Sequence, residues 1–317
     1  MTTLQHASVA SVAGSARRAA RWHRPLMLVA AVMAVLAVWS AAGLLLDDRL
    51  VGGVPVWLKP FKFAVSFVLY CMTLAWMITL VERRKRLAHW AGTAVAVSGA
   101  FEVLLIAGQA ARGRASHFNS TTPFDDFVWT AMGATISVLW VGTLILAVLL
   151  FRSGITDRAN RWAVRLGVVL SIVGMSLGTL MLLPSASQRE KLAAGEDTII
   201  GAHSVGVEDG GSGMLLTGWS TTGGDLRIPH FVGLHALQLL PVLAMLLALL
   251  ARRTPRLTPD RRARLVLLGA ALFTGLLALV TWQALRGQPL IHPDTLTLTA
   301  AGLLASAGAG GTAAILR

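Results

Sequence analysis

Residues 126–150 read DFVWTAMGATISVLWVGTLILAVLL, and the only charge in this run is that of Asp126 at its first position. An α-helix rises about 1.5 Å per residue, so a helix of this length exceeds the roughly 30 Å hydrocarbon core of a bilayer. A spanning strand would need only about 9–11 residues. Because backbone groups in lipid must be hydrogen-bonded within a helix or a closed barrel, the run predicts a transmembrane helix.

Seven further apolar runs of spanning length occur along the chain. They cover residues 25–46, 63–81, 88–109, 162–183, 230–251, 264–284 and 296–316. The composition agrees, with 55% hydrophobic residues, 14% charged residues and a mean hydropathy of +0.67. We therefore expect an all-α, polytopic protein with eight transmembrane helices and the lipid bilayer as its partner.

Two of these runs have individual features. The first is longer than the roughly 7–15 apolar residues of a cleavable signal peptide, so we expect it to be retained as a helix. The last is rich in Ala and Gly, and small residues let helix backbones approach closely in lipid. We therefore expect residues 296–316 to form an interior packing helix.

The charges are distributed unevenly between the connections. If the N-terminus is cytoplasmic, the inner segments hold 19 of the 28 basic residues and only three acids, Glu82, Asp157 and Asp260. This asymmetry satisfies the positive-inside rule and predicts a cell-membrane protein with both termini in the cytoplasm. It also accounts for the net charge of +13 without nucleic acid as a partner.

Short motifs of the first half recur in the same order in the second half. QAARG at residues 109–113 matches QALRG at 283–287, and LKPFKF at 58–63 matches LRIPHF at 226–231. These matches predict a cytoplasmic segment at 1–24 and two parallel four-helix repeats at 25–151 and 162–317. The second repeat includes an outer loop at 184–228, which we interpret as an ordered cap, with a flexible linker as the alternative.

Polar residues near the outer helix ends are the candidates for function, because such residues are costly at membrane depth. The candidates for a substrate or proton site are Glu102, Lys62, Gln109, Arg112, Arg227, Gln283, Arg286, Asp125 and Asp294. Arg112 and Arg286 could clamp an anionic group, or they could pair with Asp125 and Asp294. Glu102 could carry a proton, form an ion pair, or be satisfied by a neighbouring hydroxyl.

Histidines supply the candidates for a cofactor site. The residues are His235, His230, Gln238, His117, His292 and His203, with His235 as the predicted metal ligand and Gln238 orienting its ring. His230 lies five residues before His235, so a regular helix would hold the two on different faces. The simpler interpretation is that these histidines form interfacial hydrogen bonds. The single cysteine excludes an intramolecular disulfide and a thiolate cluster.

Two resemblances to known protein families add to this interpretation of the sequence. Residues 218–235 read GWSTTGGDLRIPHFVGLH, and here the chain resembles a family of uncharacterised bacterial multi-pass membrane proteins that carries no assigned activity. Separately, two parallel four-helix halves with histidines at the outer helix ends are similar in layout to haem A synthase. That family has a haem-ligating histidine on each even-numbered helix, whereas here only His235 matches by position. The likeness is one of layout and does not establish haem.

Three hypotheses for function follow. The first is a membrane redox or haem-binding protein with haem b or a metal ion between the helical halves, working with an electron-transfer partner. The alternative is a small-molecule or proton-coupled transporter or channel. The third is a receptor or assembly factor that binds a partner through residues 184–228. The sequence does not decide whether the protein is an enzyme.

Overall fold

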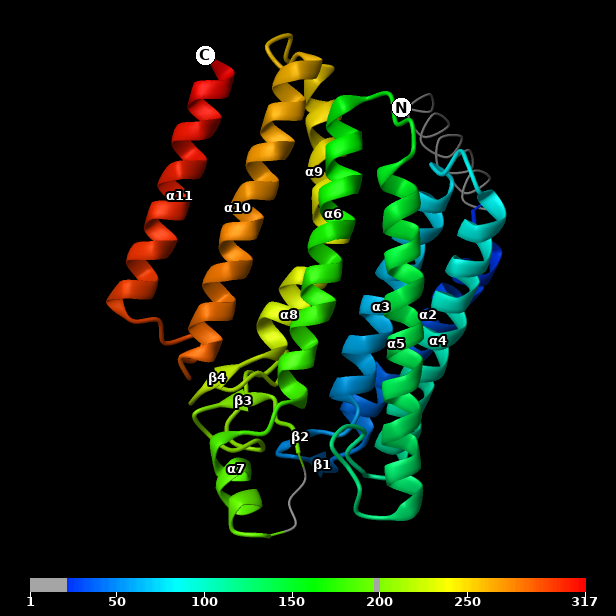
Figure 1. Cartoon of the computed structure of the whole chain (residues 1–317), viewed down its shortest axis with the longest axis vertical. Helices are drawn as coiled ribbons and strands as arrows, with labels where there is room; N and C mark the ends of the chain where they lie inside the picture. Colours follow the sequence, from blue (N-terminus) through cyan, green and yellow to red (C-terminus); the bar gives the residue numbers. More distant parts are fainter. Residues whose placement is uncertain (1–21, 197–199) are drawn as a thin grey trace, which may run out of the picture.

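The computed structural model describes residues 22–196 and 200–317. Nearly all of the predicted cytoplasmic segment at 1–24 lies outside the described residues. Seven helices in the described ranges are long and apolar enough to cross a membrane (Figure 1). They are α2 (Arg24–Leu46), α3 (Leu58–Ile78), α4 (Lys85–Ala111), α5 (Pro123–Phe151), α6 (Arg158–Leu177), α10 (Pro259–Leu285) and α11 (Thr295–Leu316).

An eighth span is broken in two. Helices α8 (Arg227–Leu234) and α9 (Ala236–Ala251) meet at His235 with a bend of 40°, and together they pass the same length and apolarity test. The expectation of a continuous helix over 230–251 is therefore wrong. Pro241 lies inside α9, where it donates no backbone hydrogen bond and crowds the carbonyl four residues earlier. With this bent pair counted as one span, the all-α fold with eight spans agrees with the prediction.

Short elements cover one end of the bundle (Figure 1). A hairpin of β1 (Leu50–Val51) and β2 (Val54–Pro55) precedes α3, and its turn is made by Gly52 and Gly53, which both have positive φ. This turn geometry favours glycine at both central positions. Helix α6 continues into η1 (Gly178–Leu182). The outer loop that follows contains α7 (Ala186–Ala193), β3 (Ser204–Val205) and β4 (Gly224–Asp225).

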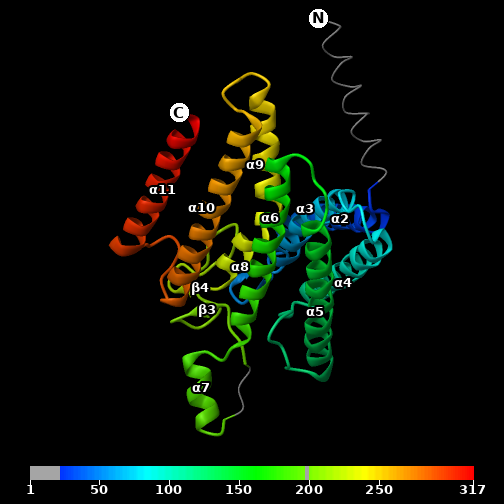
Figure 2. The same ribbon diagram turned by 45° about the horizontal axis from the view of Figure 1, so that its top comes forward.

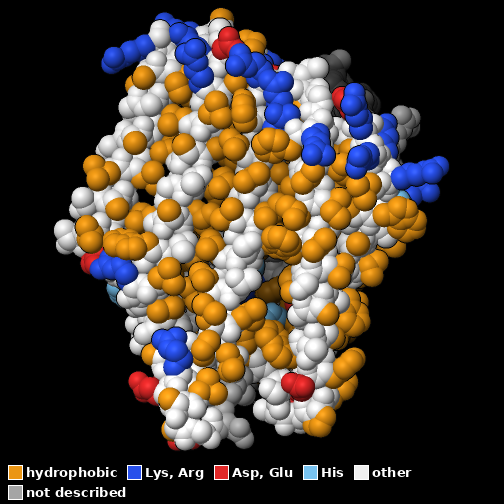
Figure 3. Space-filling view, viewed as in Figure 1, with side chains coloured by type: hydrophobic (Ala, Val, Ile, Leu, Met, Phe, Trp, Pro, Cys, Tyr) orange, Lys and Arg blue, Asp and Glu red, His pale blue; other side chains and the backbone are white. Residues whose placement is uncertain are grey.

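Lysine and arginine side chains gather at the opposite end of the bundle, next to the C-terminus (Figure 3). This end holds the basic connections that follow α3, α5 and α9. The separation of a basic end from a strand-bearing end agrees with the charge pattern of the sequence. Which end faces the cytoplasm stays a prediction.

The two halves pack in the same order. Helix α2 contacts α3 and α4, and in the second half α6 contacts α8, α9 and α10. Helix α5 packs on α4 and also contacts α6, which joins the halves. The duplication itself stays a prediction, although this shared order is what it requires.

The interior position expected for residues 296–316 is wrong. Helix α11 lies at the edge of the molecule beside α10 (Figures 1 and 2), and only Thr297 and Gly308 among its residues are buried. Small residues permit close packing but do not require it.

Candidate functional site

The site is built around the first two turns of α3. This helix begins at Leu58, five residues before the predicted apolar run, so Lys59 and Lys62 both lie within it. Residues three apart share a helix face. Trp57 at the N-cap makes no side-chain capping hydrogen bond. Two cations therefore lie at the positive end of the helix dipole, where an anion is the favoured occupant.

Lys59 contacts a histidine of the α4–α5 connection. Its Nζ lies 3.0 Å from Nδ1 of His117. A charged ammonium group can only donate, so we assign Nδ1 of His117 as the acceptor and its ring proton to Nε2. Burial lowers the pKa of His117 well below its ordinary value, and the positive charge of Lys59 lowers this pKa further. The imidazole is therefore neutral at pH 7.

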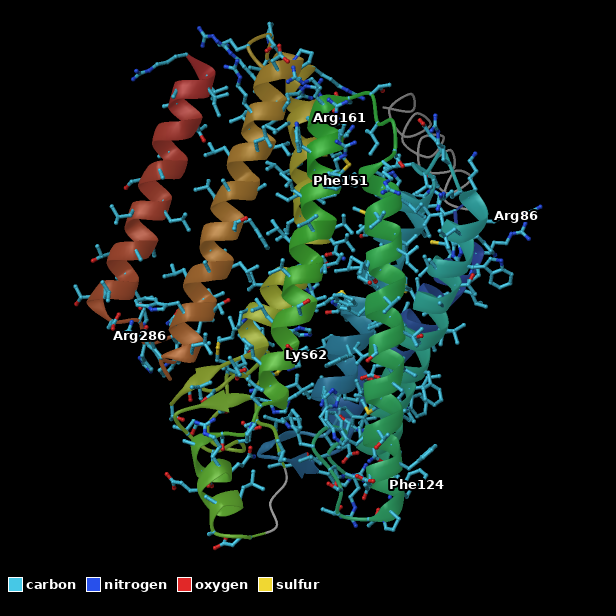
Figure 4. The ribbon with its side chains drawn as sticks, viewed as in Figure 1. Lys62, Arg86, Phe124, Phe151, Arg161 and Arg286 are labelled. Carbon is cyan, nitrogen blue, oxygen red and sulfur yellow. The ribbon has the colours of Figure 1, made fainter. Side chains whose placement is uncertain are left out.

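Lys62 and Arg227 are held together by one loop. Lys62 donates to the carbonyl of Thr217, and Nη2 of Arg227 donates to the next carbonyl, that of Gly218, over 2.8 Å. Two adjacent carbonyl groups thus bring a cation from α3 next to a cation from α8. Lys62 lies near the centre of the molecule, between α3 and α6 in Figure 4. This contact also folds the outer loop back onto α3.

Only one of these cations has a carboxylate partner. Arg227 binds Asp225 through Nη2 at 2.5 Å and Nε at 2.9 Å, and Asp225 is fully buried. Among the described residues, neither Lys59 nor Lys62 has a carboxylate within ion-pair distance. The two lysines of the site therefore have no ion-pair partner of their own between α3 and α8.

Glu102 is a second buried acid close to this site. It lies on α4 with 4% of its surface exposed, and Oγ1 of Thr135 on α5 donates to it over 3.1 Å. Lys59 is close enough to act on it electrostatically but makes no ion pair with it. The interpretation that a hydroxyl satisfies Glu102 is therefore correct for this conformation, and its role as a proton site stays a prediction.

Two other histidines are oriented by hydrogen bonds at Nδ1. His203 lies 2.7 Å from a carboxylate oxygen of Asp209, and His230 lies 2.8 Å from the carbonyl oxygen of Gly174. Since both acceptors lack protons at neutral pH, Nδ1 donates in each ring and leaves Nε2 available. Burial lowers the pKa of His203, and the Asp209 hydrogen bond partly opposes this shift. Histidine side chains are visible between α5 and α6 in Figure 3.

His235, the predicted metal ligand, lies at the break between α8 and α9. Its ring centroid is 4.3 Å from that of Phe231, and Oε1 of Gln238 is buried without a partner among the described residues. A Cβ built on Gly233 would lie 2.4 Å from Cα of Gly174. The space beside Gly233 is therefore filled by the α6 backbone, and a haem does not fit there. The part of the chain that the structure describes contains no group of three or more potential metal ligands.

The remaining candidates form two separate clusters at the ends of α4 and α10. Arg112 pairs with Asp125 at 2.7 Å, where Gln109 also binds, and Arg286 pairs with Asp294 at 2.5 Å. The ion-pair interpretation of both arginines is thus supported. Gln283 binds the carbonyl of Pro289, and His292 is exposed in the same connection. Arg286 lies on the α10–α11 side, away from Lys62 (Figure 4).

The two clusters share their local geometry. Gly113 and Gly287 have φ of 68° and 72°, and the glutamine four residues earlier in each case binds a carbonyl six residues beyond itself. This similarity is expected of a duplication. It also shows that these residues close their helix ends rather than join the site at Lys62.

The sequence did not reveal the carbonyls of Thr217 and Gly218 or the carboxylate of Asp209. The only signal was the Gly-rich composition of residues 206–224, which permits a tight loop but does not indicate what the loop contacts. Comparison with known proteins finds no matching family model, no similar curated protein and no similar solved structure.

Proposed function

We propose that this protein is a membrane transporter or channel that binds a small anionic molecule between α3 and α8. The observation that carries the proposal is the meeting of Lys59, Lys62 and Arg227, of which only Arg227 has a carboxylate partner. The outer loop at residues 200–226 lies at the strand-bearing end of the bundle (Figure 1), and its carbonyl groups at Thr217 and Gly218 cover the site.

The stability of the fold does not explain why Lys59, Lys62 and Arg227 lie close together. Partly buried cations are costly without paired charges, and like charges in close proximity repel each other. Lys59 and Lys62 also oppose the dipole of the helix that carries them. A bound anion would remove all three costs at once, because its charge would compensate the lysines and the helix end together.

The chemistry of the donors indicates an oxyanion. Lys62 and Arg227 already donate to carbonyl oxygens, so an oxygen of a carboxylate or phosphate could replace these acceptors. Guanidinium and ammonium groups are the usual protein partners of such anions. Glu102 on α4 would supply the proton site in a coupled mechanism, since an acid inside a membrane helix is a default candidate for proton transfer.

The proposal is tested by binding and flux of defined anions. Purified protein should bind inorganic phosphate or a short carboxylate such as lactate, and proteoliposomes should take up the bound anion. Lys62→Met should weaken binding by about tenfold or more, as expected for the loss of a charged hydrogen bond. Lys191→Met, on the exposed face of α7, removes the same charge from the same end and should have no effect.

Two results would overturn the proposal. One is a failure of folded protein to bind any oxyanion of these classes. The other is equal weakening by Lys62→Met and Lys191→Met, because the effect would then come from net charge rather than from the site.

One observation favours a redox protein as the second candidate. His203 and His230 each have Nδ1 engaged and Nε2 available, which is the arrangement that orients a metal-ligating histidine. An absorbance spectrum and a metal analysis of the purified protein test this candidate. A Soret band that disappears in His230→Ala but persists in His292→Ala would support it, whereas colourless, metal-free protein would refute it.

A further inference from the structure

A second positively charged site lies at the basic end of the bundle, between α5 and α6. Arg161 and Arg165 are one turn apart on α6, so they share a face. The guanidinium of Arg165 lies 4.9 Å above the ring of Phe151 on α5, and Arg152 follows that residue. Phe151 and Arg161 lie in the same region between the two helices in Figure 4.

Two of the three nearby acids are already engaged elsewhere. Asp157 pairs with Arg262 at 3.3 Å and caps α6, and Asp260 pairs with Arg158 at 2.6 Å. Glu82, which lies beside Gly154, makes no ion pair within the described ranges. Residues 1–21 contain no Asp or Glu and so cannot contribute a carboxylate.

At this site, Arg152, Arg161 and Arg165 have no carboxylate within ion-pair distance among the described residues. The single side-chain hydrogen bond of Arg161 is to the carbonyl of Ile155, at a long 3.5 Å. Nε of Arg165 is buried and has no hydrogen-bond partner in the described structure. A buried guanidinium donor without an acceptor costs free energy unless a ligand supplies the acceptor.

We propose that these arginines bind the phosphate head group of an anionic phospholipid. Arginine forks match the two free oxygens of a phosphodiester. The position selects a lipid, because Arg165 lies within the predicted apolar run at 162–183, at the boundary of the hydrocarbon core. Phe151 is 44% exposed beside it and offers an apolar surface for the acyl chains. Basic pockets between helices at the basic end of a membrane protein are a known setting for such head groups.

The simpler explanation is that these arginines only set topology, for which their exact positions do not matter. The two explanations predict different effects on lipid binding when positive charge is removed at this site. Arg252 and Arg253 lie at the same end, in the α9–α10 connection, and both are exposed. The double variant Arg252→Gln/Arg253→Gln therefore removes the same charge as Arg161→Gln/Arg165→Gln without touching the site.

The experiment measures binding of dioleoyl-phosphatidylglycerol to the purified full chain by native mass spectrometry, with dioleoyl-phosphatidylcholine as the neutral lipid. Arg161→Gln/Arg165→Gln should weaken phosphatidylglycerol binding about ten- to thirtyfold, given the usual contribution of each basic residue near anionic lipid. The Arg252/Arg253 variant should bind as the parent protein does. Inorganic phosphate at millimolar concentration should not displace the lipid.

If the glutamine variant does not fold, Arg161→Lys/Arg165→Lys keeps the charge and removes the paired donors. It should still weaken binding severalfold, because lysine cannot reproduce the fork. Unchanged binding in the lysine variant would overturn the proposal, as would equal losses in the two glutamine variants. Displacement by inorganic phosphate would overturn the lipid assignment.

Discussion

Replacing Gly174 by alanine should destabilise the protein more than any other glycine-to-alanine change in the interior of α5 or α6. A Cβ at this position would lie 2.4 Å from the carbonyl carbon of Gly233 and 2.5 Å from the amide nitrogen of Leu234. Both atoms belong to the backbone of α8, so no side-chain rotation can relieve the clash. Ordinary van der Waals contact begins near 3.4 Å, so α6 and α8 must separate by about 1 Å.

The expected magnitude follows from two opposing terms. Overpacking of this kind costs about 1–3 kcal/mol, and a clash with backbone belongs at the upper end of that range. Alanine gains up to about 1 kcal/mol over glycine in a helix. The net loss for Gly174→Ala should therefore be about 2 kcal/mol. Gly133 in α5 has no atom within 4 Å of its built Cβ. Gly133→Ala should therefore only gain the higher helix propensity of alanine, without a clash.

Reversible unfolding in mixed micelles measures both changes against the parent protein. The difference between the variants should be about 3 kcal/mol, with Gly133→Ala the more stable. The clash should also reach His230, whose Nδ1 donates to the carbonyl of Gly174. Equal stability of the two variants would refute the argument, because it would mean that α6 and α8 are not in backbone contact.

Three further predictions concern the site, its loop and the orientation in the membrane. Glu102→Gln keeps the size of the side chain and its contact with Thr135, so anion binding should persist. Anion uptake should lose its response to a pH gradient, because the variant has no carboxylate to carry a proton. Flux that still follows the gradient would exclude Glu102 as the proton site. Burial lowers the pKa of His203, so the open loop binds more protons than the closed loop, and closure should weaken as the pH falls through about 6.5. After correction for the intrinsic pH dependence of amide exchange, the protection of residues 200–226 should fall between pH 7 and pH 5, and His203→Gln should flatten that dependence; unchanged protection in the parent protein would contradict it. In a Cys71→Ala background, a cysteine at Ser212 should react with an impermeant thiol reagent in intact cells and one at Thr254 should not, whereas the reverse pattern would invert the assigned topology.

The spans could be predicted from the sequence because each depends on a local property. Residues 126–150 carry no charge after Asp126, and the structure extends that run to Pro123–Phe151. Lipid leaves such a run no alternative to a helix. The edge position of α11 could not be predicted in the same way. Its small residues indicate what could pack closely, but whether a partner is present depends on the arrangement of all the helices.

Three residues of the proposed site were candidates from the sequence, but Lys59 was not among them and the grouping could not be predicted. Lys62, Arg227 and Glu102 were selected as candidates because they are polar residues near helix ends, and burying such residues in lipid costs free energy. The same criterion also selected Arg112 and Arg286, which form ion pairs with Asp125 and Asp294. The difference lies at Lys62, which has no carboxylate partner among the described residues, whereas Arg112 and Arg286 each have one.

The break at His235 had a partial signal in Pro241, six residues later. A proline in an apolar run predicts a distortion, yet the location of the bend depends on tertiary contacts. Here Gly233 holds α8 against Gly174 of α6, so the distortion is displaced toward the start of the span. No pattern within residues 230–251 indicates that contact.

The loop carbonyls of Thr217 and Gly218 have a consequence for the rate at which a ligand can enter. They occupy the donors of Lys62 and Arg227, so an incoming anion exchanges one set of oxygen acceptors for another. Such an exchange leaves little net gain in hydrogen bonds, and the binding free energy must come mainly from charge. The anion can also enter only after the loop has moved away from these two donors. The observed association rate constant should therefore stop rising with anion concentration and reach a plateau at the rate of loop opening.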